Sequence, residues 1–243
     1  MLRYIYDGTF DGFLTVIYNC YYNNIPESIE KENSFTFNIL FEDNFIISDN
    51  VQSNKVSRAI LDKISKEALI NVYQSFLSEK PGIEMKLFTY IQLGFRIGSK
   101  INDYLTDETV NQIQKYSRKV GREAHKFLGL VRFQEFRGIL YAAIEPTYNI
   151  LELIGNHFKA RLTNEMWIIH DIKRKIGIVY KDDEWILRNL EFKKVVSCEE
   201  EELFYQNLWK VFHKSVSIKE RINEKLQMKN MPKKYWNNLI EMK

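Results

Sequence analysis

The chain has 243 residues, a formal net charge of +3, 45% hydrophobic residues and 14% aromatic residues. These values exclude a disordered or fibrous protein and predict a globular chain that can bury a substantial core. The two cysteines, Cys20 and Cys198, belong to no CxxC or Cys/His spacing, so we predict no disulfide framework, no metal site and no cofactor.

The amino terminus lacks the apolar core of a signal peptide, because acids and glycines interrupt it. The longest charge-free run near it, residues 12–26, is too short and too rich in Thr and Asn to span a bilayer. We therefore expect a soluble cytoplasmic protein with no membrane partner.

The first fifty residues predict a short strand, a helix and further strand. Residues 2–6 alternate β-branched and aromatic side chains and stop at Asp7-Gly8. Apolar residues then recur at helical spacing over 9–22, with Asp7 or Thr9 as the cap. Residues 34–48 predict strand on both sides of an acidic turn at 42–44.

The middle of the chain is predicted to be helical. Four segments carry helical periodicity, at 52–63, 65–79, 81–99 and 106–127. Pro81 fits the first turn of the predicted helix at 81–99. Thr106 is predicted to cap the helix at 106–127, and Gly129 is predicted to end it.

After Gly129 the periodicity changes to that of strands. Strand patterns occur at 130–136, 139–146, 165–171, 175–181 and 184–189, with one helix at 149–162 between them. A capping box of Ser197 and Glu200 predicts a final helix over about 197–227, and the tail is expected to dock through Tyr235, Trp236 and Leu239. The fold class predicted is α+β: a short N-terminal strand and helix, a helical middle, and a β-rich second half with a crossover helix and a C-terminal helix. We predict a single domain over 1–243, with a sub-division near residue 129 as the alternative.

Charge is distributed unevenly along the chain. Residues 1–50 hold eight acids and two bases, whereas residues 115–137 hold seven bases against Glu123 and Glu135. Helical spacing places five of the bases on one stripe, which we call the basic face: Lys115, Arg118, Lys119, Arg122 and Lys126. Another face carries Ile113, Val120, Ala124 and Phe127 and suits a buried seam.

A row of cations such as the basic face attracts a polyanion, since each neutralised phosphate releases condensed counterions. An ordinary solvated helix face is the alternative.

The familiar catalytic signatures are absent. The sequence has no G-x-x-x-x-G-K-[ST], G-x-G-x-x-G, H-E-x-x-H or G-x-S-x-G, and no zinc-deaminase motif. Nucleotide-phosphate cradles and common hydrolase sites are therefore not predicted.

Several weaker groupings remain, each with a structural alternative. His157 and Arg161 are four residues apart on a predicted helix and can grip a phosphate or form a plain surface pair. His170-Asp171 ends a strand, where the histidine can act as acid or base or be satisfied by a turn. Glu145, before Pro146, offers a carboxylate on stiff backbone or a cap for the next helix.

Five blocks resemble a bacterial DNA-metabolism or DNA-repair family built on domain of unknown function 4130. They are Y-D-G-T-F-D-G-F-L-T at 6–15, V-G-R-E-A-H-K-F-L-G-L-V-R-F at 120–133, I-E-P at 144–146 with I-L-x-L-I-x-x-H-F at 150–158, W-I-I-H-D at 167–171 and M-P-K-K-Y-W at 231–236. The matching positions include Asp7, Gly8, Gly12, Arg122, Glu123, His125, Lys126, Arg132, His157, Trp167 and Asp171. The resemblance implies a radical-SAM protein of DNA modification or repair as partner. In some similar chains a uracil-DNA glycosylase-like domain is attached, but this sequence lacks that domain's G-Q-D-P-Y and H-P-S motifs.

The function we predict first is a DNA-repair accessory protein that binds nucleic acid and cooperates with the radical-SAM protein. Its expected contacts are Lys115, Arg118, Lys119, Arg122, Lys126, Arg132 and Arg161. One alternative is a DNA-acting enzyme that uses His125 or His170 with Glu123, Glu145 or Asp171. Another is an interaction scaffold that docks through its acidic amino-terminal end. We also expect Arg122 or His125 to share a cleft with Glu145, His157 or His170.

Overall fold

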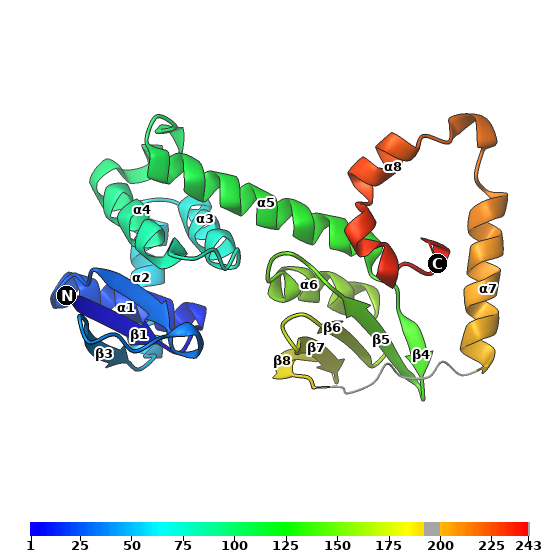
Figure 1. The fold of residues 1–243 in the computed structure, drawn as a ribbon, viewed down its shortest axis with the longest axis horizontal. Coiled ribbons are helices and arrows are strands. Elements are labelled where there is room, and N and C mark those ends of the chain that lie inside the picture. The colour runs from blue at the N-terminus through cyan, green and yellow to red at the C-terminus, as the bar shows by residue number, and fades with distance from the viewer. Residues whose placement is uncertain (192–199, 243) are drawn as a thin grey trace. The chain divides into compact units, whose positions relative to one another are not determined.

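The computed structural model describes residues 1–191 and 200–242, and the chain forms two compact units, Met1–Val120 and Gly121–Lys243 (Figure 1). The predicted capping box at Ser197 lies outside the described residues, as does Cys198. Helices and strands are both present, so the α+β prediction is confirmed. Among the described helices, none has the length and apolar character that crossing a membrane requires.

Unit 1 begins with a small parallel sheet. It contains β1 (Leu2–Tyr6), β2 (Ser28–Lys31) and β3 (Glu42–Ile46) in the order β2-β1-β3, with α1 (Phe10–Tyr22) after β1 and a 3₁₀ turn at Glu32–Ser34. Thr9 caps α1 by accepting from the Gly12 amide, as predicted, and Asp7 in turn accepts from the Thr9 amide.

The acidic turn predicted at 42–44 is wrong, because these residues form most of β3. β3 pairs with the central strand β1, where Arg3 is only 3% exposed. Arg3 donates to Asp43 at 2.8 Å and to Glu30 of β2 at 3.3 Å. A buried guanidinium needs carboxylate partners, and this need explains why an acidic segment is a strand here.

The opening motif has a structural role in the β1–α1 junction. Asp7 accepts from Thr9 and from the hydroxyl of Ser48, two residues after β3. A Cβ at Gly12 would lie 2.2 Å from the Asp7 carboxylate and 2.7 Å from the Ser48 hydroxyl. Gly8 has φ +85°, in the left-handed region that glycine tolerates. The two glycines therefore allow the Asp7 carboxylate to join strand, helix and Ser48.

The remainder of unit 1 is helical, as predicted. It contains α2 (Asn50–Lys63), α3 (Lys66–Phe76), α4 (Ile83–Ile97), a 3₁₀ stretch at Gly98–Asp103 and the first part of α5 (Glu108–Leu130). The cap predicted at Thr106 is wrong by one residue, since Asp107 accepts from the Val110 amide. Aspartate caps better than threonine because its acceptor is charged and complements the helix dipole.

Unit 2 holds the last part of α5 and a five-stranded sheet in the order β4-β5-β6-β7-β8. Its strands are β4 (Gln134–Phe136), β5 (Ile139–Ile144), β6 (Trp167–Asp171), β7 (Ile176–Lys181) and β8 (Glu184–Asn189). β5 and β6 are parallel and α6 (Leu151–Arg161) lies between them in sequence, which confirms the predicted crossover helix. Trp167 is fully buried and stacks on Tyr180 with ring centroids 5.0 Å apart.

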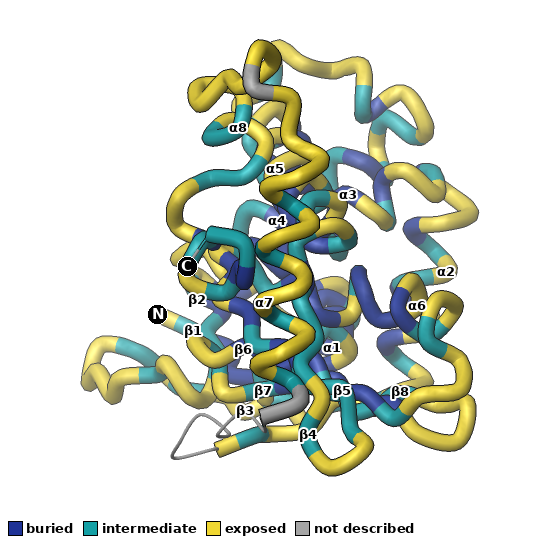
Figure 2. The backbone as a smooth tube through the Cα atoms, turned by 90° about the vertical axis from the view of Figure 1, so that its right-hand side faces the viewer, coloured by how far each residue is buried: buried dark blue, intermediate teal, exposed yellow. Residues whose placement is uncertain are grey.

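The C-terminal segment is not one helix. α7 (Glu200–Ser215) ends well before residue 227, and 3₁₀ turns at Lys219–Arg221, Lys233–Asn238 and Ile240–Met242 alternate with α8 (Glu224–Asn230). The Ser215 and Ser217 hydroxyls donate to the carbonyls of Phe212 and His213, and such bonds compete with helix continuation. α7 and α8 are exposed over most of their length (Figure 2). Tyr235 and Leu239 are buried, so the predicted docking of the tail is confirmed for these two residues.

Candidate functional site

The helix α5 has a buried face and a charged face, at the positions that its sequence period predicts. Its buried apolar residues are Val110, Ile113, Val120, Ala124 and Phe127. Its exposed residues include Lys115, Arg118, Lys119, Arg122 and His125, while Lys126 is half-buried. Lys115, Arg118 and Lys119 belong to unit 1, whereas Arg122, His125 and Lys126 belong to unit 2.

No carboxylate in the described part of the chain neutralises the cations of the basic face. The side chains of Lys115, Lys119 and Arg122 form no hydrogen bond or ion pair with any residue that the structure describes. Arg118 donates to the neutral Gln114 amide at 2.7 Å, and Lys126 donates to the Lys229 carbonyl at 3.1 Å. The face therefore presents its charge to solvent.

Glu123 directly follows Arg122 on α5 but is buried, with 6% of its surface exposed. Its carboxylate accepts from the amides of Thr147 at 3.1 Å and Tyr148 at 2.8 Å, which belong to the loop after β5. It also accepts from the Tyr235 hydroxyl and from the Lys234 ammonium at 3.2 Å. Glu123 thus joins α5, the β5–α6 loop and the C-terminal segment.

The electrostatics of this cluster favour the charged form of the Glu123 carboxylate. Burial acts to raise the pKa of Glu123, but the hydrogen bonds from Tyr235, Thr147 and Tyr148 outweigh burial and hold this pKa below its ordinary value. Burial and the neighbouring Glu123 charge both raise the pKa of Tyr235, so its hydroxyl keeps its proton and donates. Glu123, one of the candidate catalytic residues, is accordingly a charged structural acceptor.

Asp171, another candidate, has a similar role. It is fully buried and accepts from the Arg174 amide at 3.1 Å and the Arg174 guanidinium at 2.8 Å. That guanidinium also donates to the carbonyls of Thr147 at 3.0 Å and Pro146 at 3.4 Å. Glu123 and Arg174 therefore fix the same loop, and four of the five sequence blocks meet there.

The remaining candidates differ in their surroundings. His170 is 4% exposed and its Nδ1 is hydrogen-bonded to the Tyr141 hydroxyl at 2.9 Å, while burial lowers its pKa. His125, Glu145 and His157 are exposed. Within the described part of the chain, no hydrogen bond or ion pair links Arg122 or His125 to Glu145, His157 or His170.

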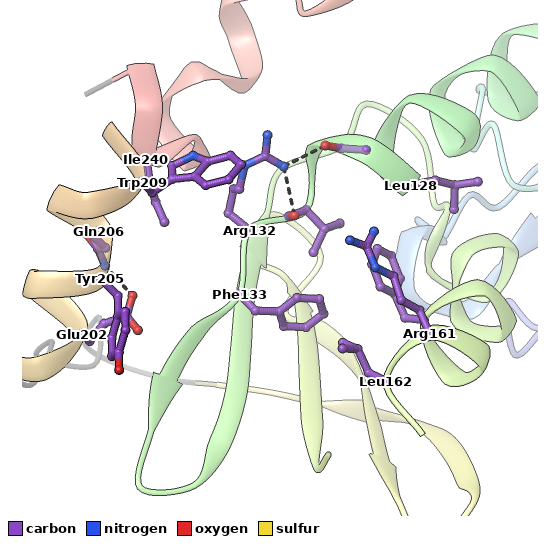
Figure 3. Close-up of a pocket in the computed structure, with 13 residues that line it drawn as sticks. Leu128, Arg132, Phe133, Arg161, Leu162, Glu202, Tyr205, Gln206, Trp209 and Ile240 are labelled. Carbon is purple, nitrogen blue, oxygen red and sulfur yellow. Dashed lines mark hydrogen bonds between the residues drawn. The ribbon is translucent and has the colours of Figure 1, made fainter. Parts of the chain in front are cut away.

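A cavity of about 520 Å³ in unit 2 brings two predicted cations together (Figure 3). Arg132 and Arg161 both line it, with Phe133, Tyr205 and Trp209. Arg132 forms a bidentate ion pair with Glu241, at 2.6 and 3.2 Å, and is not a free charge. Arg161 is exposed.

Sequence reasoning missed several residues of these two clusters, namely Tyr205, Trp209, Lys234, Arg174 and Glu241. One usable signal was Glu123 itself, since a carboxylate spaced for the apolar face of α5 needs buried donors.

In residues 1–191 and 200–242, no three His, Cys, Asp or Glu residues form a group that could hold a metal ion.

Comparison with known proteins identifies one family. The model of domain of unknown function 4130 matches residues 81–241, which include α4, α5 and the described elements of unit 2 as far as Glu241. The motif at Asp7, Gly8 and Gly12 precedes the matched range. No curated protein and no solved structure matches the chain significantly.

Proposed function

The chain belongs to the family built on domain of unknown function 4130, and from this premise we propose that it binds nucleic acid through the basic face of α5. The observation that carries the proposal is the set of exposed cations without carboxylate partners, which includes Lys115, Lys119 and Arg122. Positive charge gathered on one helix face supplies sequence-independent affinity for phosphates.

The dimensions of the basic face suit a phosphate backbone. Lys115 and Arg122 are seven residues apart on α5, which corresponds to about 10 Å along the helix axis. Duplex DNA presents roughly six phosphates over that length, counting both strands. The expected footprint is therefore about four to six phosphates.

A catalytic role has less support from the geometry. Glu123 and Asp171 are held as structural acceptors, and His170 is buried against Tyr141. We therefore favour an accessory protein of DNA repair over a DNA-acting enzyme.

The partner we propose is the radical-SAM protein that the family resemblance implies, and the outward face of α7 is the surface proposed for it. Phe204, Leu208, Val211 and Phe212 recur at helical spacing there and are 48–65% exposed. Apolar side chains gathered on a solvent face mark interaction surfaces. This surface is a better candidate for docking than the acidic amino-terminal end.

Val211→Glu with Phe212→Glu is expected to abolish copurification with a radical-SAM protein from the same genome. The reason is that two charges would have to be buried in the interface. The variant should melt like the wild type because both side chains are exposed. Undiminished copurification would remove α7 as the docking surface.

DNA binding should weaken steeply with salt. If four to six phosphates are contacted, the logarithm of the association constant should fall with the logarithm of salt concentration with a slope of about −3 to −5. Titration of labelled duplex DNA at several ionic strengths measures this slope. Absence of binding at low salt, or a flat response, would refute the proposal.

A further inference from the structure

The cavity in unit 2 combines an aromatic lining with one available cation. Its volume of about 520 Å³ lies within the range of small-ligand sites, about 300–1,000 Å³. Its walls come from the end of α5, the residues before β4, the end of α6, and α7 (Figure 3). The residues of α7 that line it are Glu202, Tyr205, Gln206 and Trp209, which lie on one face of that helix.

The indole of Trp209 is held in place by Glu241 and Arg132, among other contacts. Its Nε1 donates to Glu241 at 3.1 Å, and the Arg132 guanidinium lies 5.8 Å from the ring centroid. Glu241 in turn holds Arg132. Although fixed in this way, Trp209 remains 39% exposed. An oriented aromatic surface of this kind binds a flat ligand without an ordering cost.

Tyr205, Phe133 and Phe158 also line the cavity. Tyr205 lies one turn before Trp209 on α7 and is 57% exposed. Phe133 comes from the segment before β4 and makes edge-to-face contacts with Phe158 at 5.5 Å and Trp167 at 6.4 Å. These rings offer stacking surfaces for a planar heterocycle.

The charges of the cavity limit the ligand to a single phosphate. The side chain of Arg161 makes no hydrogen bond or ion pair to a described residue, so its guanidinium is available. Glu202 already accepts from the Glu135 amide at 3.1 Å and from Gln206 at 2.8 Å. One available cation beside one carboxylate matches a phosphodiester better than a triphosphate.

We propose that this cavity binds one unpaired nucleotide of a nucleic-acid strand, with its base stacked on Tyr205 and Trp209 and its phosphate on Arg161. The inference rests on the proposed binding of nucleic acid but assigns a second site, distinct from the basic face. It makes the protein a reader of single-stranded or unstacked positions rather than of duplex backbone alone.

The test compares two variants of the full chain with matched controls. Tyr205→Leu removes the ring at similar bulk, and Arg161→Gln removes the charge. Phe204→Leu is the control for the first, since Phe204 is the neighbouring exposed aromatic residue and does not line the cavity. Arg188→Gln, an exposed arginine of β8, is the control for the second. The probes are labelled oligothymidylate and a labelled duplex.

Tyr205→Leu and Arg161→Gln should each weaken oligothymidylate binding about tenfold, because stacking of one base or pairing of one phosphate is worth that much. Duplex binding and both controls should match the wild type. If the two variants bind oligothymidylate like the wild type while replacement of Lys115, Arg118 and Lys119 by Glu abolishes duplex binding, the cavity proposal fails and the proposed function survives. If the variants lose oligothymidylate while charge reversal has no effect, the basic face fails instead. No binding of either probe would overturn both.

Discussion

Glu123→Ala is expected to lower the free energy of unfolding of unit 2 by on the order of 3 kcal/mol. The change leaves the Thr147 and Tyr148 amides and the Tyr235 hydroxyl without their acceptor, and a buried unsatisfied donor costs about 1–3 kcal/mol. Lys234 contributes little to this cost, since its side chain is 53% exposed and can be hydrated. Urea unfolding followed by tryptophan fluorescence measures the free energy of unfolding of unit 2, because all four tryptophans lie in that unit.

The controls separate the cluster from a general effect. Glu135→Ala changes an exposed carboxylate in the same unit and should alter stability by less than about 0.5 kcal/mol. Tyr235→Phe should cost about 1 kcal/mol, and the double variant with Glu123→Ala should cost less than the sum. Equal losses for Glu123→Ala and Glu135→Ala would contradict the structural role.

Acid should destabilise unit 2 by protonating the Glu123 carboxylate. Since the pKa of Glu123 is lowered in the fold, its contribution to stability is complete above the ordinary value of 4.5 and is lost as the pH falls through the lowered pKa. Glu123→Gln should therefore be less stable than the wild type at neutral pH and lose less on acidification. The pKa of His170 is also lowered, so the stability that neutral His170 contributes is complete above pH 6.5 and falls as the pH drops below that value. This loss is the same in the wild type and in Glu123→Gln. Parallel pH profiles of the wild type and Glu123→Gln would refute the assignment.

Replacing Lys115, Arg118 and Lys119 together by Glu is expected to reduce affinity for duplex DNA by about two orders of magnitude or more. The slope against salt should also become shallower by about three, one for each lost phosphate contact. The fold should survive, because these side chains are exposed and the Ile113–Val120 seam is untouched.

The matched control reverses Lys55, Arg58 and Lys63, which are exposed on α2 of the same unit. It changes the net charge equally, so retained binding would assign the effect to α5. His125→Gln provides the second comparison, because it removes the imidazole that an enzyme would use as acid or base and keeps hydrogen bonding. An accessory protein should be almost indifferent to it, whereas an enzyme using His125 would bind DNA and lose turnover. If neither change affects DNA association or repair in cells, the basic face is only solvated surface.

The sequence by itself determined the features that depend on neighbouring residues. The helix at 9–22, the crossover helix and the two faces of α5 were predictable because helix period, turn residues and strand alternation are local properties. Errors occurred where a distant residue decided the outcome. The acidic residues at 42–44 form a strand because Arg3, about forty positions away, needs carboxylate partners.

The tertiary structure alone decided what the candidate residues do. Glu123 is adjacent in sequence to cations of the basic face, yet its donors lie 24 to 112 positions away. Arg132 is paired with Glu241, 109 positions away, whereas Arg161 is left available in the same cavity. Spacing along one helix specifies which face a side chain occupies, but only the packing of separate segments specifies whether its charge is neutralised there, because ion pairs and buried hydrogen bonds depend on distances of a few ångströms in space.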